Sequence, residues 1–389
     1  MVSVPGRSLG FVLLGGVVWA CGTTAPAAQA NTSCDDVQVL VAARNQMTTE
    51  VCGAPNHCEL STSTTGADLG TDPQLATSNK RTFFINRAGT PGDLIFELDP
   101  KCGTPILPAI NVHGSGIGVA DVNPHDVAAA PDGSLFVVLY NVPRIDIVRN
   151  KVVASTIDLS MYDMDGNPQA ESIAIVQVGG VPKAFVALER LDDTDVNLTS
   201  RQDSLMLRID VATAKVEDKI TLAGRNPFNS MAESGGALFL AEPRNFDSAD
   251  EDAAGIERFD TATSTTKLLV TEHDLGGSVA EIAVSDGCGA AIVAGPEPTV
   301  NPTSVVTFDP TSGKVLTAPG SPVLGPTPGY DLQALAWRGD LLYVGDRRPG
   351  ATGYPIHVFQ RDPGTCNLHE VTDRSFVVPQ PAVALRPAL

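Results

Sequence analysis

PHDVAAAPDGSLFVVLYN, at residues 124–141, is the stretch that decides the fold. A run of small and aliphatic residues ends at the turn Asp132-Gly133, and a second aliphatic run begins at Leu135. Asp-Gly supplies the positive φ that a tight hairpin needs at little steric cost. The stretch therefore predicts two short antiparallel strands joined by a tight turn.

The same pattern recurs along the chain. Strand-like runs of small residues centre on Val127, Ile173, Met231, Ile282, Leu335 and Val383, at successive spacings of 46, 58, 51, 53 and 48 residues. The first five runs lead into a second aliphatic run, and a third run with an aspartate turn follows. Periods near fifty with about four short strands each are typical of a β-propeller, in which small inner strands converge on an axis.

Six inner strands predict six blades. The run Ala382–Arg386 lacks partners, and the unit beginning at Phe83 lacks an inner strand, so we expect the two to form one composite blade that closes the ring and covers both sheet edges. The alternative is a seventh blade built from residues 37–75. The expected organisation is a signal peptide at 1–20, a spacer and disulfide-pinned segment at 21–78, and the propeller at 79–389.

Residues 124–141 are similar to the repeat of bacterial YVTN and NHL propellers, and FDPTSGKV at 308–315 resembles their turn between third and fourth strands. The resemblance is at the level of the fold. Trp-Asp pairs are absent, which argues against a WD40 propeller. Because one fold hosts hydrolases, lyases, receptors and scaffolds, the resemblance implies no single function.

The N-terminus has the pattern of an export signal. One positive charge at Arg7 precedes an apolar stretch from Leu9 to Ala20, and Cys21 follows in a sequence that resembles a bacterial lipobox. We therefore expect lipidation at Cys21 and an outer-membrane lipoprotein that faces the periplasm or the cell surface. Cleavage after Ala30 is the alternative. Six other cysteines remain after either cleavage, and an even number in an exported chain predicts disulfides.

The overall charge argues against several partners. The chain has 389 residues, with Lys+Arg 26 against Asp+Glu 45 and a net charge of −19. Such an acidic chain repels nucleic acid. The only long apolar run lies at the extreme N-terminus, which argues against a multi-pass membrane protein. We expect contact with a membrane only through the lipid anchor. The partner is a protein or a small molecule whose identity the sequence leaves open.

Polar residues stand just before the predicted inner strands, where they would surround one mouth of the axis. Their oxygen-rich set resembles the axial calcium site of gluconolactonase-type propellers, in which the ion polarises an ester and activates water. The alternative is that these side chains bind one another and axial water. The residues are His125, Asp126, Glu171, Asn229, Glu281, Asp331 and Gln333.

One loop also resembles half of a calcium-binding loop. Asp163, Asp165 and Asn167 alternate around a glycine, and Glu171 follows. The possible Ca²⁺ ligands are thus these four residues together with Glu281. A solvated acidic loop is the alternative, because the full twelve-residue pattern is missing.

An arginine follows the end of four second strands, at Arg87, Arg190, Arg244 and Arg347. Guanidinium groups recognise carboxylates and phosphates, so these four residues are candidate ligand contacts. Structural ion pairs between blades are the alternative explanation.

No nucleophile motif such as G-x-S-x-G, no H-E-x-x-H and no P-loop occurs. The sequence therefore favours a non-catalytic propeller that binds a ligand or protein partner on its acidic, loop-rich face. Ligand contacts are expected from His125, Asp126, Asn229, Gln333 and the four arginines. The alternative function is a calcium-dependent lactonase or related hydrolase of the gluconolactonase type.

Overall fold

The computed structural model describes residues 34–44, 49–56, 58, 72–89, 92–114, 118–195, 197–246, 252–295, 302–317 and 320–389. The unit Cys34–Leu389 consists of seven antiparallel sheets arranged as a ring, within this described part. The first twenty residues and Cys21 lie outside it, so the expected signal and lipidation site remain predictions. No helix among the described residues is long and apolar enough to cross a membrane.

Four sheets have the regular four-strand order of a propeller blade, in which the strands follow one another from the axis to the rim. They are β3 (Pro73–Ser78), β4 (Arg81–Asn86), β5 (Leu94–Leu98) and β6 (Pro105–Asn111); β7 (Pro124–Ala129), β8 (Leu135–Leu139), β9 (Arg144–Arg149) and β10 (Val152–Asp158); β11 (Ala170–Val178), β12 (Val181–Leu188), β13 (Leu205–Asp210) and β14 (Lys215–Thr221); and β15 (Phe228–Ser234), β16 (Ala237–Glu242), β17 (Gly255–Asp260) and β18 (Thr265–Thr271).

The other three sheets are less regular. They are β19 (Ser278–Ser285), β20 (Cys288–Ala294) and β21 (Thr303–Phe308); β22 (Leu332–Arg338), β23 (Leu341–Asp346) and β24 (Tyr354–Arg361), with β25 (Leu368–Glu370) and β26 (Phe376–Val378) both on β24; and β27 (Ala382–Pro387), β1 (Val39–Arg44) and β2 (Thr49–Ala54). The helical elements of the described chain are a 3₁₀ turn at Ser160–Tyr162 and α1 (Glu272–Leu275).

The expectation of six blades was wrong, and the seven-blade alternative is correct. The C-terminal strand β27 pairs with β1, from Ala43 opposite Ala382 to Val39 opposite Pro387, and not with the strand at Phe83. That blade has its own inner strand, β3, in which Ala76 lies opposite Phe83. The stretch 21–78, expected as a spacer, thus supplies β1, β2 and β3.

Seven apolar clusters, one between each pair of neighbouring sheets, fill the space between the blades. Val39, Val41 and Leu385 pack against the sheet of β22–β26 on one side of the closing blade. Leu40, Ala42 and other residues of the closing blade pack against the sheet of β3–β6 on its other side. Because each sheet is buried on both faces, alternate residues of one strand contribute to two different clusters.

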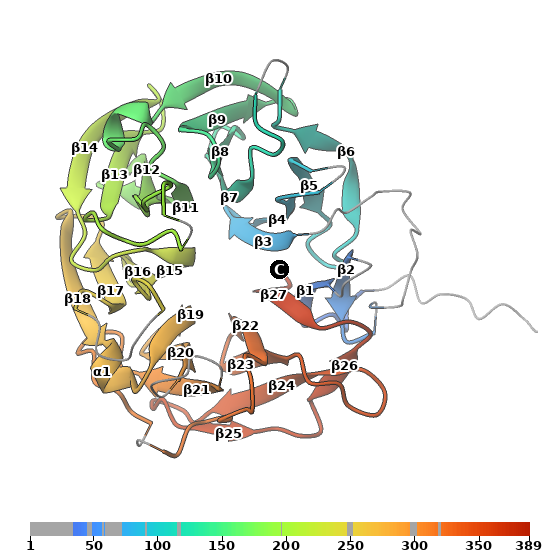
Figure 1. The fold of residues 1–389 in the computed structure, drawn as a ribbon. Coiled ribbons are helices and arrows are strands. Elements are labelled where there is room, and N and C mark those ends of the chain that lie inside the picture. The colour runs from blue at the N-terminus through green and yellow to red at the C-terminus, as the bar shows by residue number, and fades with distance from the viewer. Residues whose placement is uncertain are drawn as a thin grey trace, which may run out of the picture. The chain divides into compact units, whose positions relative to one another are not determined.

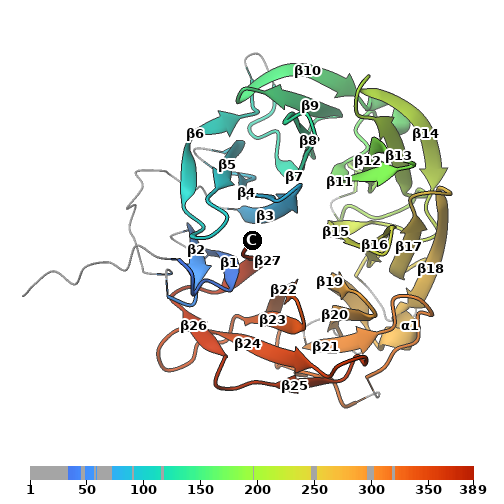
Figure 2. The same ribbon diagram turned by 180° about the vertical axis from the view of Figure 1, so that it is seen from behind.

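The inner strands β3, β7, β11, β15, β19, β22 and β27 surround the axis, and each contacts the next (Figures 1 and 2). The predicted hairpins lead from these strands to the second strands. Gly133 and Gly287 take positive φ, 86° and 73°, in two of the turns. Small side chains such as Ala128 and Ala334 are fully buried where the blades converge.

Three disulfides confirm the expected oxidised cysteines: Cys34–Cys102, Cys52–Cys58 and Cys288–Cys366. The first joins the start of the described chain to the turn between β5 and β6. The third joins β20 to the segment between β24 and β25, and so links two neighbouring blades. Disulfides of this kind are typical of chains that fold in an oxidising compartment.

Candidate functional site: the axial cavity

A cavity of about 1440 Å³ runs along the axis, between the inner strands. Ligand pockets are usually about 300–1,000 Å³, so this cavity has room for a ligand of ordinary size together with water. Its lining is mixed in character. Charged groups from both halves of the chain line it together with aromatic side chains, among them Arg44, Asp72, Arg87, Asp126, Phe228, Glu281, Tyr330, Asp331, Trp337, Arg347 and Arg386.

Five of the inner strands share an irregularity close to their first residues. A register shift places one extra residue on the inner strand, or two in β15, which turns the neighbouring side chains and amides toward the axis. The shifts lie between Pro124 and Asp126, Ala170 and Ser172, Phe228 and Ala232, Val279 and Glu281, and Gln333 and Leu335.

Carboxylates at these positions bind the backbone of the next blade. Glu281 accepts hydrogen bonds from the amides of Ala334 at 2.8 Å and Leu335 at 3.0 Å. Asp126 accepts from Ile173 at 3.0 Å and from its neighbour Val127 at 2.8 Å. Both oxygens of each side chain are therefore committed to backbone N–H groups. These residues therefore hold adjacent blades together.

Glu171 has the same role in the third blade. One oxygen accepts from the amide of Asn229 at 2.9 Å, and the other contacts Nδ1 of His125. Burial acts to raise the pKa of Glu171, but His125, Arg87 and the Asn229 amide together outweigh burial and lower the pKa. This carboxylate is therefore the charged member of the group, and His125 is its immediate partner.

A tyrosine and a second glutamate extend this network away from the axis. The rings of His125 and Tyr140 are stacked, with centroids 4.3 Å apart, and the Tyr140 hydroxyl donates to Glu189 at 2.7 Å. Burial and the nearby Glu171 carboxylate raise the pKa of Glu189 well above its usual value. The pKa values of the two acids are thus shifted in opposite directions, that of Glu171 down and that of Glu189 up.

Arg386 of β27 lies in the axial cavity among these carboxylates. Its guanidinium donates to the Ser230 hydroxyl at 3.0 Å and to the Leu385 carbonyl at 2.7 Å. The field of Glu281 and Asp126 acts on it, although no ion pair joins it to either residue in the described chain. Ser230 belongs to β15, so this side chain reaches from the closing blade to another part of the ring.

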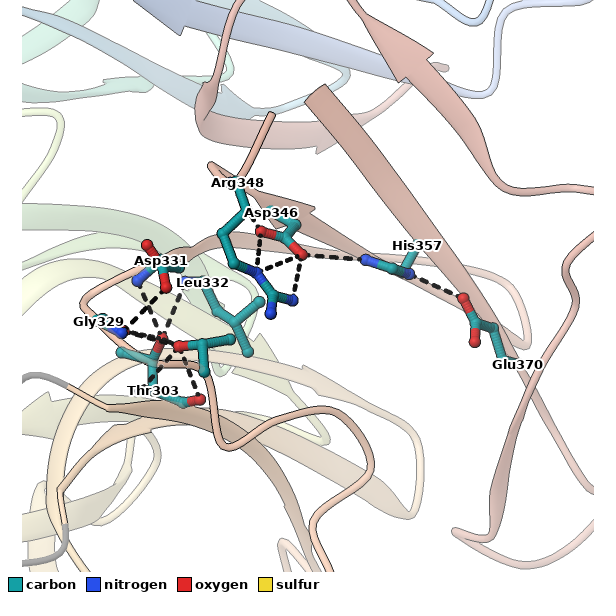
Figure 3. Close-up of polar contacts among 9 residues, drawn as sticks. Thr303, Gly329, Asp331, Leu332, Asp346, Arg348, His357 and Glu370 are labelled. Atoms are coloured by element: carbon teal, nitrogen blue, oxygen red, sulfur yellow. Dashed lines mark hydrogen bonds and ion pairs between the residues drawn. The ribbon is translucent and has the colours of Figure 1, made fainter. Parts of the chain in front are cut away.

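A long segment between β21 and β22 brings further groups to the mouth. It takes the place of a fourth strand through short bridges, Val305 to Leu324 and Phe308 to Val315. The Thr303 hydroxyl then accepts from the amide of Leu332 at 2.9 Å and pairs with the Thr327 hydroxyl at 2.8 Å (Figure 3). This anchoring sets the positions of Tyr330 and Asp331, which precede β22 and line the cavity.

Tyr330 and Arg347 meet at this part of the lining. Burial raises the pKa of the Tyr330 hydroxyl to about 12, Glu281 raises it as well, and Arg347 lowers it. The side chain of Arg347 is exposed, and no described residue forms a hydrogen bond or ion pair with its guanidinium.

Beside this mouth, a charged network crosses the sheet of β22–β26. Asp346 binds Arg348 through several contacts, the shortest 2.6 Å, and accepts from His357 at 3.3 Å (Figure 3). His357 also contacts Glu370 at 2.8 Å. Burial acts to lower the pKa of His357, but Asp346 and Glu370 outweigh it and raise the pKa. The network holds the strands and Arg348 in place, outside the cavity lining.

Of the four arginines proposed as ligand contacts, three are bound within the protein. Arg87 pairs with Asp72 at 3.0 Å, Arg190 donates to Gln202 at 2.6 Å, and Arg244 donates to the Asp252 carbonyl at 2.9 Å. The second contact lies within the loop between β12 and β13, and the third lies within the segment between β16 and β17. Arg347 differs from them because its guanidinium remains available at the cavity.

The five candidate calcium ligands do not come together. Asp163 is held by Gln202 at 2.8 Å and lies 3.6 Å from the Arg190 guanidinium, while Asp165 accepts from the Asn167 amide in a local turn. Glu171 and Glu281 belong to different blades, β11 and β19. Among the residues that the structure describes, no three His, Cys, Asp or Glu side chains are grouped so as to hold a metal ion.

The predicted mouth residues are better placed. Asp126, Asn229, Glu281, Asp331 and Gln333 all line the axial cavity, whereas His125 and Glu171 are not part of that lining. Sequence reasoning missed Arg386 and Tyr330. A signal for Arg386 was present, because it is a charged residue in a strand whose repeats otherwise carry mostly small and apolar side chains.

No protein-family model and no curated protein matches the chain. Among solved structures, a protein from Lactobacillus plantarum matches with a TM-score of 0.56 and 14% identity, over 90% of this chain and 99% of that one. The Dos1 propeller matches with a TM-score of 0.50 and 15% identity, over 79% of this chain and 71% of that one. These similarities show the fold: the chain is a β-propeller.

The dihydro-heme d1 dehydrogenase NirN is a more distant match, with a TM-score of 0.47 and 15% identity over 80% of this chain. This chain spans 59% of the length of that protein. At this level of similarity the match carries no functional information.

Proposed function

We propose that this protein is an exported, non-catalytic binding protein that holds a ligand, or a segment of a protein partner, at the mouth of its axial cavity. The main support is a difference between the acidic and the basic side chains of the lining. Glu281 and Asp126 use both carboxylate oxygens on backbone amides, while the guanidiniums of Arg386 and Arg347 retain donors that face the cavity. Rigid walls with a few uncommitted polar groups are typical of binding sites.

The proposal includes export and a lipid anchor at Cys21. The three disulfides support export, because such bonds persist in oxidising compartments. The anchor rests on the lipobox-like sequence alone. It would keep the propeller at a membrane surface, with its loop-rich face open to partners.

A calcium-dependent lactonase or related hydrolase is the second candidate. Burial raises the pKa of Asp126 to about 7, and a carboxyl group with such a pKa suits proton transfer near neutral pH. Against this, the axial carboxylates that a calcium ion would need are already bound to backbone amides. The geometry therefore favours binding.

Blocking the cavity tests the proposal. Ala174 lies on β11 and lines the cavity, so Ala174→Trp should fill part of it, while Val152→Trp adds the same ring to the exposed outer strand β10. In a ligand-observed NMR screen of small organic fragments, we expect Ala174→Trp to weaken binding at least tenfold and Val152→Trp to leave it unchanged. Hits that bind equally well to both variants would contradict a site in the cavity.

The purified protein also allows the binding function to be distinguished from the hydrolase function. Elemental analysis of the purified protein and a γ-lactone hydrolysis assay, each with and without a chelator, provide the comparison. A stoichiometric divalent metal, together with a lactonase activity that the chelator abolishes, would contradict the binding function and support the hydrolase. Fragment binding that is insensitive to the chelator supports the binding function.

A further inference from the structure

Arg386 has more hydrogen-bond donors than the protein uses. A guanidinium carries five N–H donors, and the described residues accept from it at the Ser230 hydroxyl and the Leu385 carbonyl. The side chain is partly exposed, and it lines the axial cavity. A cation that is desolvated on several sides and still has free donors is suited to an anionic group from outside.

The groups around Arg386 explain why its donors remain free. Asp126 of β7 and Glu281 of β19 exert a favourable field on it, yet each has both oxygens turned to backbone amides. The two acids thus compensate the buried charge without occupying the guanidinium. Their hydrogen bonds to the neighbouring blades keep these carboxylates from rotating to pair with the Arg386 guanidinium.

We propose that Arg386 binds the carboxylate of a small organic acid in the axial cavity, which defines the ligand class of the binding function proposed above. A planar carboxylate matches the guanidinium fork in a bidentate manner. A single negative charge fits better than two, because Asp126 and Glu281 face the same space. This inference rests on the proposed function and adds its ligand chemistry.

The rest of the lining indicates what accompanies the carboxylate. Phe228, Tyr330 and Trp337 line the same cavity, and the Tyr330 hydroxyl lies in the field of both Glu281 and Arg347. An acid with an aromatic or other apolar body would therefore find both its charge and its body accommodated.

Matched fluorinated probes test the ligand class on the native protein. By ¹⁹F NMR, 4-fluorobenzoate should bind at least tenfold more tightly than its neutral isostere 4-fluorobenzamide, and several-fold more tightly than 4-fluorophenyl phosphate. Equal binding of acid and amide, tighter binding of the phosphate, or no binding of the acid at millimolar concentration would each overturn the proposal. This comparison does not depend on any variant.

Variants then test the residue. Arg386→Met should reduce the preference for acid over amide to near one, and Arg386→Lys should keep part of it, because the charge stays while the fork is lost. Arg149→Met is the control, since Arg149 pairs with Asp132 on an exposed edge. Retention of the full preference in either Arg386 variant, shown by circular dichroism to be folded, would overturn the assignment. If Arg386→Met does not fold, Arg386→Lys and the native comparison still decide.

Ala174→Trp distinguishes a failure of the carboxylate proposal from a failure of the proposed binding function. Equal binding of acid and amide that Ala174→Trp abolishes would reject the carboxylate class and leave the axial cavity as the binding site. Binding of either probe that Ala174→Trp does not affect would contradict the site itself, and both proposals with it.

Discussion

At the axis, single acidic side chains connect whole blades. Glu281 receives two backbone hydrogen bonds from β22, and Asp126 receives one from β11, so each residue joins its own blade to the next. Asp126 is buried and Glu281 is half-buried, and their charge is compensated by amide dipoles and by the field of Arg386. Carboxylates of the kind that often bind metal ions thus have a structural role here.

This role predicts a stability effect at Glu281. Glu281→Ala leaves the amides of Ala334 and Leu335 without their acceptor, and we expect the free energy of unfolding to fall by about 2 kcal/mol or more. Glu97→Ala is the control, because its partly exposed ion pair with Arg81 should contribute less than about 1 kcal/mol. Urea unfolding of the three proteins measures the difference. Equal losses in both variants would show that Glu281 does not join the blades as described.

At the level of elements, sequence patterns predicted most strands but not all inner ones. The runs at Val127, Ile173, Met231, Ile282, Leu335 and Val383 are strands, because aliphatic runs between turn residues identify them. β3 was missed because its sequence, PQLATS, has few of the β-branched and aromatic residues that mark a strand. Its identity depends on tertiary pairing with β4, which no local pattern records.

The blade of β19–β21 also differs from the expected repeat. Its fourth strand is replaced by the segment that the Thr303–Thr327 pair anchors. Side-chain contacts between residues 24 positions apart leave no periodic signal in the sequence. For that reason Tyr330, which this segment positions at the cavity, was not among the predicted site residues.

The disulfide between neighbouring blades should matter more than the local one. Cys288–Cys366 closes a loop with a sequence separation of 78, and Cys52–Cys58 one of 6. Loop entropy assigns about 4.5 kcal/mol to the first and about 2 kcal/mol to the second. We therefore expect the double variant Cys288→Ala/Cys366→Ala to lose about 2 kcal/mol more stability in urea unfolding than Cys52→Ala/Cys58→Ala. A larger loss in the second variant would indicate that the N-terminal disulfide is the main constraint.

For the whole molecule, closure of the ring by the C-terminal strand was predicted correctly. The strand with which it pairs was predicted wrongly. The sequence showed that the strand at Ala382–Arg386 lacks neighbours, and the structure gives it β1 and β2 from the opposite end of the chain. Asp126, Asn229, Glu281, Asp331 and Gln333 line one cavity despite the error, because adding a blade widens the ring without changing which end of each inner strand faces the mouth. Arg386 could not be assigned a role until its strand had a place in the ring.

Closure by β27 predicts how the molecule fails when the strand is removed. In a chain that ends after Gln380, β1 loses its inner neighbour and two of the seven clusters lose buried side chains, among them Ala384 and Leu385. We expect the melting temperature to fall by at least about 10 °C, since each large buried side chain contributes about 1.5–3 kcal/mol. Calorimetry measures the shift, and a chain lacking only the exposed Leu389 is the control, with an expected shift below about 2 °C.

The same truncated chain offers a test of the strand itself. A synthetic peptide of residues 381–389 should add to the open edge of β1 and restore part of the lost melting temperature, whereas a peptide in which Ala384 and Leu385 are replaced by aspartate should not. Strand addition requires the backbone ladder and the apolar contacts together, and the altered peptide retains only the ladder. An unchanged melting temperature on truncation, or equal rescue by both peptides, would contradict closure of the ring through β27.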